Sequence, residues 1–352
     1  MKINQCPLIY EGSVKNVRES IQNSSEYFFE YTDKYSIFDW GEMPDHIDYK
    51  GESLACFAQI MFDYLKLQGV ESHAKGLVDE NLEACGKSKY LKVKKVDVVR
   101  PKMNKTVSGE ISYDYKVYQD KNKLQNALVP LEVIFRLGLP KGSSYLNRVK
   151  NSKFKVGDFF EEPIIEFSTK LEPMDRYVNE SEAKLIAGLS ESEFNNLVQK
   201  TRLIALKVRD LFKEFNIILW DGKFEFAFTP GKNPNERDVE LVDAIGIDEL
   251  RLTYNNIQLS KEFLRQYYKN TPWFEACNKA KELGKARGIE DWQSLCEVPP
   301  KLPREVKHIV ENMYMNLTNI LSLHVLKKKV FQNAIEFEQF LKEIDKFSFA
   351  KT

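Results

Sequence analysis

The chain has 352 residues, of which 43% are hydrophobic and 30% are charged, so it is long enough to bury a large core in two lobes. Its 52 basic and 52 acidic residues cancel, which excludes a global charge that would draw the chain onto nucleic acid or a membrane surface. The five cysteines lack CxxC spacing and no apolar stretch approaches the ~20 residues that span a bilayer, so we expect a cytoplasmic protein with free thiols.

The first part of the chain is predicted to be a small mixed lobe. Residues 1–100 alternate short strand-like runs, such as Tyr27–Tyr31, with one helical stretch, Ser53–Leu67, whose apolar residues recur at every third or fourth position. Residues 101–128 are polar and lie between two strand-like runs. We interpret them as an inserted hairpin or a mobile loop whose removal costs little core.

The rest of the chain is predicted to form a central lobe and a helical end. Residues 129–258 contain strand-like runs and one long amphipathic helix, Ser190–Phe215, which opens with a helix-start pattern of serines and acids. Residues 259–352 follow a helical pattern that is interrupted by prolines near Pro303.

Two N-terminal segments carry groups that suit phosphate binding or turn formation. Gly12 and Ser13 form a turn between two strands, and Lys15 returns on the second strand, so backbone N–H groups and one cation can face a polyphosphate. An ordinary hairpin turn explains the same residues. The segment from Asp33 to Asp39 and the later Lys50 are explained by turn and capping chemistry without any function.

A third segment places charged groups in an apolar strand. Glu132 lies within the run Val129–Phe135, where an unpaired carboxylate is costly, and Arg136 ends the run shortly before Gly142 and Ser143. An arginine with a hydroxyl and free turn amides can bind a phosphate monoester. A purely structural arrangement of Glu132 and Arg136 is the alternative.

The most informative segment alternates acids and bases. Asp221, Lys223 and Glu225 are two residues apart, so on a strand they share one face while Phe224 points to the core. Carboxylates with a lysine between them, followed by Asp243, suit a Mg-nucleotide site because they supply hard oxygen ligands and a charge for a phosphate. The alternative is a solvated strand face with a cross-strand ion pair.

Taken in order, these motifs resemble those of the phosphoribosylaminoimidazole-succinocarboxamide synthases, the SAICAR synthetases of purine biosynthesis. The resemblance spans roughly residues 7–322. The matching positions are Tyr10, Gly12, Lys15, Asp33, Ser36, Asp39, Lys50, Gly51, Pro130, Glu132, Arg136, Gly142, Ser143, Asp221, Lys223, Glu225, Phe226, Asp243, Asp248 and Arg251.

The resemblance implies both a fold and an activity. The fold is α+β, with an antiparallel nucleotide-binding lobe like those of kinases and ATP-grasp enzymes, a larger lobe of sheet and helices, and C-terminal helices. The activity is ATP-dependent ligation of L-aspartate to the carboxylate of carboxyaminoimidazole ribonucleotide through an acyl phosphate. ATP and Mg²⁺ are the implied cofactors, and whether the chain is a homo-oligomer is left open.

The resemblance also implies roles for individual residues. Lys223 and Asp39 are the implied catalytic residues, and Glu225 and Asp243 are the implied metal ligands. The implied nucleotide-binding residues are Gly12, Ser13, Lys15, Asp97, Val99, Glu225 and Asp243. The residues implied to bind the other substrates are Ser36, Arg136, Ser143, Lys170, Asp175, Asp248 and Arg251.

Departures from the family pattern keep other functions open. Ser13 replaces a loop lysine, Leu250 replaces a serine, the spacing from Arg136 to Gly142 is one residue longer, and the segment from Lys170 to Arg176 lacks the family's histidine. A divergent paralogue that makes another amide, a small-molecule kinase and a non-catalytic ATP-binding protein are the alternatives.

Overall fold

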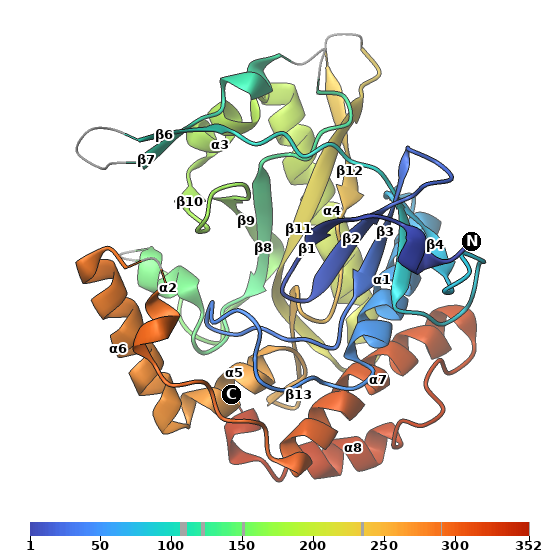
Figure 1. Cartoon of the computed structure of the whole chain (residues 1–352), viewed down its shortest axis with the longest axis vertical. Coiled ribbons are helices and arrows are strands. Elements are labelled where there is room, and N and C mark those ends of the chain that lie inside the picture. The colour runs from blue at the N-terminus through green and yellow to red at the C-terminus, as the bar shows by residue number, and fades with distance from the viewer. Residues whose placement is uncertain (106–110, 121–123, 150–151, 234–235, 290, 352) are drawn as a thin grey trace. The chain divides into compact units, whose positions relative to one another are not determined.

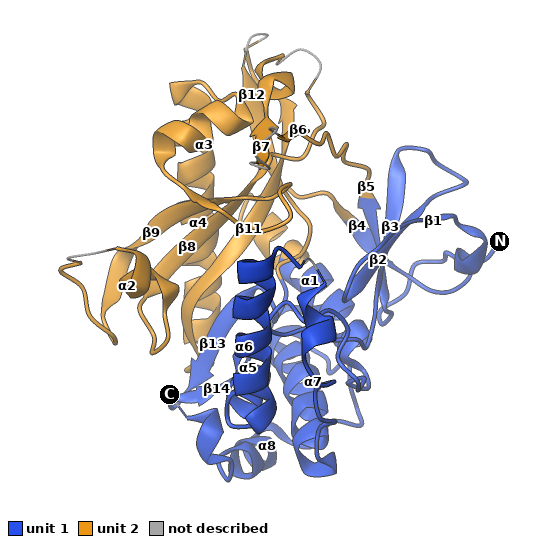
Figure 2. Ribbon diagram, turned by 60° about the vertical axis from the view of Figure 1, so that its left-hand side comes forward, with its two compact units in different colours: residues 1–61, 75–93, 246–352 blue, residues 62–74, 94–245 orange. Residues whose placement is uncertain are grey.

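The computed structural model describes residues 1–105, 111–120, 124–149, 152–233, 236–289 and 291–351. It contains two compact units, coloured separately in Figure 2. Unit 1 comprises residues 1–61, 75–93 and 246–352, and unit 2 comprises residues 62–74 and 94–245. The sequence predicts domain boundaries at residues 100, 128 and 258, which divide the chain differently from these units. Those boundaries stay a prediction.

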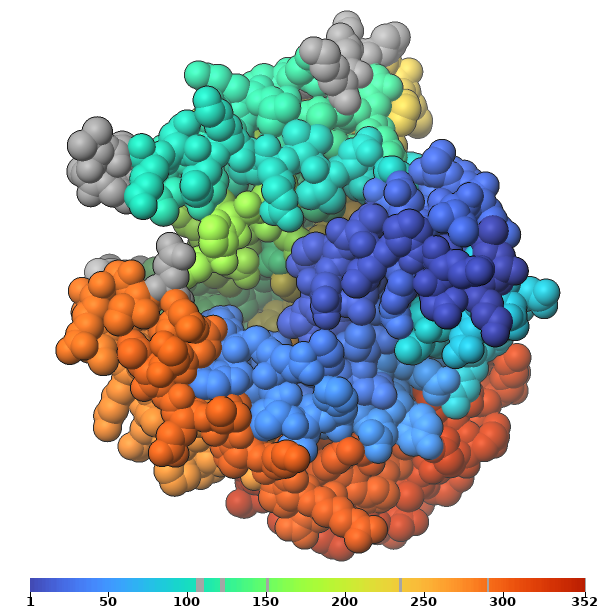
Figure 3. Space-filling view, in the orientation of Figure 1, coloured from blue at the N-terminus to red at the C-terminus, as the bar shows by residue number. Residues whose placement is uncertain are grey.

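Unit 1 contains a five-stranded sheet with the order β1-β2-β3-β5-β4. Its strands are β1 (Leu8–Glu11), β2 (Lys15–Glu19), β3 (Glu26–Tyr31), β4 (Ala74–Val78) and β5 (Tyr90–Lys94). All four residues of the edge strand β1 are exposed, and the N-terminal segment, dark blue, lies on the face shown in Figure 3. Helix α1 (Lys50–Leu67) confirms the predicted helix and begins three residues earlier.

The C-terminal part of unit 1 is mainly helical, as the sequence predicts. A short antiparallel hairpin, β13 (Leu250–Tyr254) and β14 (Ile257–Gln258), precedes the helices. The helices are α5 (Glu262–Lys269), α6 (Pro272–Arg287), α7 (Arg304–Leu326) and α8 (Phe337–Ile344). Pro303 is the N-cap residue of α7, where a missing N–H costs nothing.

Unit 2 is built on an antiparallel sheet with the order β10-β9-β8-β11-β12. Its strands are β8 (Leu131–Gly138), β9 (Phe159–Thr169), β10 (Tyr177–Val178), β11 (Ile218–Pro230) and β12 (Arg237–Val242). Helices α2 (Ser144–Arg148), α3 (Glu180–Ala187) and α4 (Glu191–Lys213) complete it, and α4 packs on the sheet (Figure 1). The two antiparallel sheets and the C-terminal helices confirm the α+β fold class.

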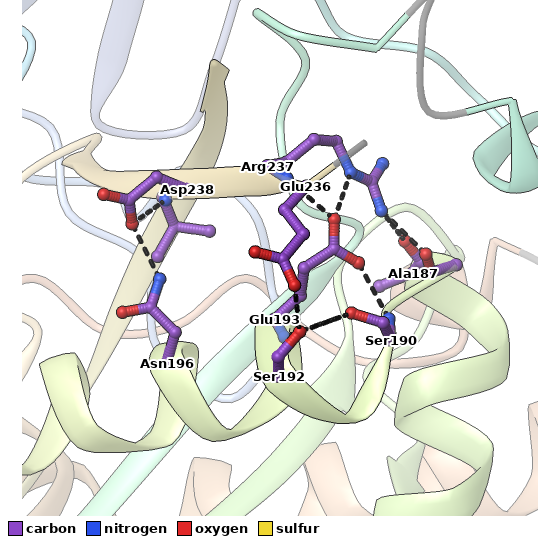
Figure 4. Close-up of polar contacts among 10 residues, drawn as sticks. Ala187, Ser190, Ser192, Glu193, Asn196, Glu236, Arg237 and Asp238 are labelled. Atoms are coloured by element: carbon purple, nitrogen blue, oxygen red, sulfur yellow. Dashed lines mark hydrogen bonds and ion pairs between the residues drawn. The ribbon is translucent and has the colours of Figure 1, made fainter. Parts of the chain in front are cut away.

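Helix α4 begins where the sequence predicts, and a buried ion pair fixes its first turn to β12 (Figure 4). Glu193 Oε2 accepts from the Ser190 N–H at 2.7 Å, while its Oε1 accepts from the backbone N–H and the Nε of Arg237 at 2.9 and 3.1 Å. The Arg237 guanidinium also donates to the Gly188 carbonyl and lies 3.8 Å from the Phe228 ring centroid. Helix α4 and strand β12 are therefore joined by a buried ion pair.

Replacing Arg237 with alanine is expected to lower the free energy of unfolding by about 3–5 kcal/mol, because Glu193 is left buried without its counter-charge. The matched control is Lys200→Ala. Its pair with Asp238 has side chains 35% and 42% exposed, so its loss should cost less than about 1 kcal/mol. Urea unfolding of both variants checks the contrast, and equal losses would contradict it.

The segment 101–128 is partly the predicted hairpin and partly packed structure. Strands β6 (Lys102–Lys105) and β7 (Ile111–Asp114) pair in antiparallel fashion, which confirms the hairpin, while residues 106–110 and 121–123 lie outside the described part of the chain. Tyr115 and Tyr118 are buried, and the Tyr118 hydroxyl donates to the Val99 carbonyl at 2.6 Å. The expectation that this segment contributes little core is therefore wrong for the residues after β7.

Tyr118→Ala is expected to lower the free energy of unfolding by about 3–5 kcal/mol, because it opens a cavity the size of an aromatic ring. Tyr118→Phe keeps the ring, removes only the hydroxyl's contacts with the Val99 and Leu128 carbonyls, and should cost about 1 kcal/mol. Tyr113→Ala, on the partly exposed strand β7, should change stability by no more than about 0.5 kcal/mol. Denaturant titrations followed by circular dichroism will rank the three, and a neutral Tyr118→Ala would restore the loop interpretation.

The remaining short elements are 3-10 helices: η1 (Ile3–Gln5), η2 (Lys116–Gln119), η3 (Trp292–Leu295) and η4 (Ser348–Ala350). Across the described residues, no helix combines the length and the apolar character needed to cross a membrane.

Candidate functional site

Strands β8 and β11 carry the charged row that the sequence singles out. They pair in antiparallel register, with Asp221 opposite Arg136 and Lys223 opposite Ile134. Phe224 and Phe226 are at most 1% exposed and enter the core, as the alternation predicts. Asp221 and Glu225 are only 7% exposed, so the alternative is wrong about solvation, but its cross-strand ion pair is present between Asp221 and Arg136 at 3.0 Å. Buried carboxylates require partners, and each has one.

The first group of partners, here called the carboxylate–lysine cluster, consists of Glu132, Lys170, Lys223, Glu225 and Asp243. Glu132 Oε1 accepts from Lys223 Nζ at 2.6 Å and from Lys170 Nζ at 3.2 Å. Lys170 Nζ also donates to Glu225 Oε1 at 2.6 Å. Asp243 follows Val242, which lies opposite Glu225 in the β11–β12 register. Three acids and two lysines thus come from the start of β8, the middle of β11, and the positions just after β9 and β12.

The two glutamates of this cluster have pKa values shifted in opposite directions. Burial alone would raise the pKa of Glu132, but Lys223 and Lys170 outweigh it and hold the pKa below its ordinary value. At Glu225, burial and the neighbouring charge of Asp243 together raise the pKa, and Lys170 offsets them only in part. Glu225 therefore sits beside a second carboxylate with too little positive charge nearby, which is the condition that a bound cation relieves.

Glu225 and Asp243 suit a magnesium ion that also binds a nucleotide. No group of three or more histidine, cysteine or acidic side chains able to hold a metal occurs among the described residues. Mg²⁺ in nucleotide sites is usually held by one or two carboxylates together with phosphate oxygens and water. Two acids therefore fit a metal that arrives with its nucleotide, whereas a permanent metal centre built from protein ligands alone has no support in the described residues.

A second group surrounds Arg136. Its Nη1 donates to Asp221 at 3.0 Å, its Nε to Glu166 at 2.5 Å, and its Nη2 to Ser144 Oγ at 3.3 Å. Arg136 is 3% exposed, and burial is outweighed by Asp221 and Glu166, which raise its pKa above the ordinary value. The predicted structural arrangement of Glu132 with Arg136 is therefore wrong, because Arg136 pairs with Asp221 and Glu166 while Glu132 pairs with lysines.

Ser143, a predicted substrate-binding residue, lacks the kind of hydrogen bond that its neighbour Ser144 makes. Its Oγ is buried and has no hydrogen-bond partner among the described residues, whereas Ser144 contacts Arg136. A buried hydroxyl without a partner is costly unless a ligand supplies one. The roles of Ser143 and Arg136 in substrate binding stay predictions.

The predicted phosphate loop in unit 1 is a tight hairpin turn. The Gly12 N–H donates to the Lys15 carbonyl at 3.1 Å, and a Cβ at position 12 would approach that oxygen to 2.5 Å, so only glycine fits without a shift. Ser13 is exposed, and Lys15 Nζ lies 4.2 Å from the Phe29 ring centroid. The turn keeps its backbone accessible at Ser13, and its nucleotide role stays a prediction.

The other predicted residues of unit 1 have varied surroundings. Asp248 is held by Lys50 Nζ at 3.1 Å and by the Tyr314 hydroxyl at 2.5 Å, deep in the unit. Asp39 is exposed and accepts from Lys281 Nζ at 3.0 Å. Ser36 and Arg251 are partly exposed. Asp248 therefore serves as an internal anchor in this structure, and its contact with substrate stays a prediction.

Three predicted residues of unit 2 lie outside the carboxylate–lysine cluster. The Asp97 backbone pairs with that of Asn126 and Leu128, and the Val99 carbonyl accepts from the Tyr118 hydroxyl. Asp175 is exposed, as is most of the loop that contains it.

Comparisons with known proteins identify the family of the chain. Residues 8–280 match the family model described as SAICAR synthetase. A relative from Archaeoglobus fulgidus is 35% identical over 331 residues, which are 88% of this chain and 92% of the relative. The chain belongs to the SAICAR synthetase family. These enzymes are ATP-dependent ligases that join L-aspartate to carboxyaminoimidazole ribonucleotide in purine biosynthesis.

Further relatives extend the match along the chain. The phosphoribosylaminoimidazole-succinocarboxamide synthase of Thermoplasma acidophilum is 27% identical over 334 residues, covering 88% of this chain and 98% of that enzyme. A SAICAR synthase structure from Saccharomyces cerevisiae, complexed with SAICAR, shares the fold with a TM-score of 0.60 at 20% identity, covering 90% and 95% of the two chains. A SAICAR synthetase in complex with ADP aligns with a TM-score of 0.54 at 23% identity, covering 79% and 97%.

Several members of the site were not predicted as site residues from the sequence. Glu132 was singled out, but as a partner of Arg136, because its lysine partners lie 38 and 91 residues away along the chain. Glu166 and Ser144 carried no signal, since an acid in an alternating strand and a serine in a turn are both common. Lys50 matches the family pattern and is explained by turn chemistry, but its pairing with Asp248 follows from the fold alone.

Proposed function

We propose that this chain forms SAICAR through an acyl phosphate, with the carboxylate–lysine cluster as the place where the transferred phosphoryl group is neutralised. The proposal is carried by the contact of Lys223 Nζ with the buried Glu132 at 2.6 Å, beside the acids Glu225 and Asp243. A fixed lysine next to paired carboxylates offers one cation for a phosphoryl group and two ligands for Mg²⁺. The magnesium would draw electron density from the phosphate oxygens when bound.

The proposed roles of the remaining residues follow the family motifs. Lys223 and Asp39 are assigned to catalysis, and Glu225 and Asp243 to magnesium. ATP is assigned to Gly12, Ser13, Lys15, Asp97, Val99, Glu225 and Asp243. The carboxyaminoimidazole ribonucleotide and L-aspartate are assigned to Ser36, Arg136, Ser143, Lys170, Asp175, Asp248 and Arg251. We place the enzyme in the cytoplasm, where nucleotides are made.

The proposed reaction has two balanced steps. A carboxylate oxygen of the ribonucleotide attacks the γ-phosphorus of ATP, and the bond to ADP breaks. The amine of L-aspartate then attacks the acyl carbon, loses a proton, and expels inorganic phosphate. One oxygen of the original carboxylate therefore leaves with the phosphate. Within the cluster, Glu132 holds Lys223 in place, so that its ammonium is oriented before the phosphoryl group arrives.

A coupled ADP-release assay with each substrate omitted in turn tests the proposal. ADP release that requires both the ribonucleotide and L-aspartate, together with formation of the amide, is the expected result. ADP release without any amine would indicate a small-molecule kinase, and nucleotide binding without turnover would indicate a non-catalytic protein. Amide formation with a different amine or carboxylate would indicate a divergent paralogue.

Arg251→Ala is expected to raise the KM for the ribonucleotide about ten- to a hundred-fold, since a charge-assisted hydrogen bond to phosphate contributes about 1.5–3 kcal/mol. The Kd for ATP should stay near the wild-type value. Arg136→Ala is the less clean test, because it also leaves Glu166 and Asp221 without the guanidinium. Steady-state kinetics measure the KM for the ribonucleotide, and nucleotide titration measures the Kd for ATP. A selective loss of ATP affinity would assign Arg251 to the nucleotide instead.

A further inference from the structure

Lys170 is assigned above to substrate binding, but its contacts in the structure are with two carboxylates of the cluster. Its Nζ lies 2.6 Å from Glu225 Oε1 and 3.2 Å from Glu132 Oε1, so it bridges two buried carboxylates. Glu132 already has a second partner in Lys223, at 2.6 Å. For Glu225, Lys170 is the cation that the structure places in direct contact. The same carboxylate is the one assigned to magnesium.

A lysine and a divalent cation compete for such a carboxylate. Both are attracted to the same oxygens, and both carry positive charge, so they repel one another when they share a ligand in a buried site. An ammonium group at hydrogen-bond distance from Glu225 therefore opposes metal binding for as long as it stays there. Its charge also offsets part of the repulsion between Glu225 and Asp243.

Lys170 also has an alternative partner within reach. It contacts Glu132 through the same ammonium, and its side chain is 29% exposed, whereas those of Glu132 and Glu225 are 4% and 9% exposed. The lysine thus reaches two enclosed acids from a more open position. A small displacement away from Glu225 leaves it paired with Glu132, so no buried charge is stranded.

We propose that Lys170 is an internal counter-cation that occupies the cation position beside Glu225 and yields it to the metal-nucleotide, shifting its pairing onto Glu132. This inference rests on the proposed function, in which Glu225 binds magnesium. It makes Lys170 a positioning residue that suppresses binding of free metal and favours metal that arrives with a nucleotide. The phosphates of the nucleotide then contribute the charge that offsets the displaced lysine.

The test measures metal binding in the absence of turnover. Mn²⁺ alone is titrated at about pH 8, where an ordinary carboxyl is ionised, and the free aquo ion is followed by electron paramagnetic resonance. Lys170→Met should bind Mn²⁺ about ten-fold more tightly than wild type, a difference of about 1.4 kcal/mol. Lys170→Arg keeps the charge and should stay near wild type. Lys200→Met, which removes a lysine paired with Asp238, is the matched control.

A second measurement separates a counter-cation from an ordinary structural ion pair. Without metal, Lys170→Met should melt at a lower temperature than wild type, because Glu225 loses its partner. Mn²⁺ should then raise its melting temperature more than it raises that of wild type. A structural pair would show the same initial loss and no additional recovery with metal.

The outcomes distinguish this inference from the function on which it rests. If Glu225→Gln binds Mn²⁺ with ADP as tightly as wild type does, the metal assignment fails and the inference falls with it. If Glu225→Gln loses that binding while Lys170→Met binds free Mn²⁺ no more tightly than wild type, the metal assignment stands and the counter-cation role is overturned. Tighter binding together with recovery of the melting temperature supports the inference.

Discussion

Lys223→Ala is expected to reduce amide formation by at least about a hundred-fold, because one fixed charge that stabilises a transition state contributes on the order of 10²–10³ in rate. The loss should appear in kcat, with little change in the Kd for ATP, since the lysine acts most strongly on the transferring phosphoryl group. Glu132 keeps Lys170 as a partner in the variant, so the fold should survive.

Isotope transfer gives this prediction its sharpest measurement. The ribonucleotide is labelled with oxygen-18 in its carboxylate, and inorganic phosphate and amide are quantified in the same reaction. Wild type should produce labelled phosphate in step with amide, and Lys223→Ala should suppress both in parallel. Lys200→Ala serves as the control, since it removes a lysine paired with Asp238. Unlabelled phosphate accompanying amide would exclude the acyl-phosphate route.

The strand pattern was the part of the site most open to prediction. Alternation alone places Asp221, Lys223 and Glu225 on one side of β11 and sends Phe224 and Phe226 into the core. It does not reveal burial, because an alternating strand looks the same whether its polar face meets water or another charged strand. The fold shows that this face is covered, because Glu132 on the neighbouring strand β8 contacts Lys223.

Long-range pairing was the part that sequence reasoning could not reach. Arg136 has its carboxylate partners at Asp221 and Glu166, which are 85 and 30 residues away. Those contacts depend on the order β9-β8-β11 in the sheet, and no local spacing encodes that order. The nearer candidate, Glu132, is four residues before Arg136, but it pairs with lysines instead.

Composition misled at one place for a physical reason. The segment 101–128 is polar on average, and a polar average predicts a dispensable loop. Tyr118 reverses this locally, because its aromatic ring is at 0% exposure and buries a large apolar surface whatever the polarity of its neighbours. The hydrogen bond from its hydroxyl to Val99 then satisfies the one polar atom that burial would penalise.

Glu225→Gln and Asp243→Asn are each expected to weaken Mg-ADP binding by about ten-fold or more, because a neutral amide is a poor ligand for a hard divalent cation. The two variants should differ in stability. Glu225 is buried against Asp243 with its pKa raised, so the ionised carboxylate is costly in the metal-free protein. Its neutralisation should therefore leave the melting temperature unchanged or raise it, while Mg-ADP binding is weakened.

Calorimetric titration with Mg-ADP and with ADP in excess chelator separates metal binding from nucleotide binding. For both variants, affinity should fall with magnesium and change little without it, because the adenosine and phosphate contacts assigned to Gly12, Ser13 and Lys15 remain. Asp210→Asn is a suitable control, since Asp210 is a surface acid of α4 whose carboxylate contacts Arg209. Equal losses with and without magnesium would mean that the two acids support the nucleotide pocket itself, and unchanged Mg-ADP affinity in both variants would remove them from the metal site.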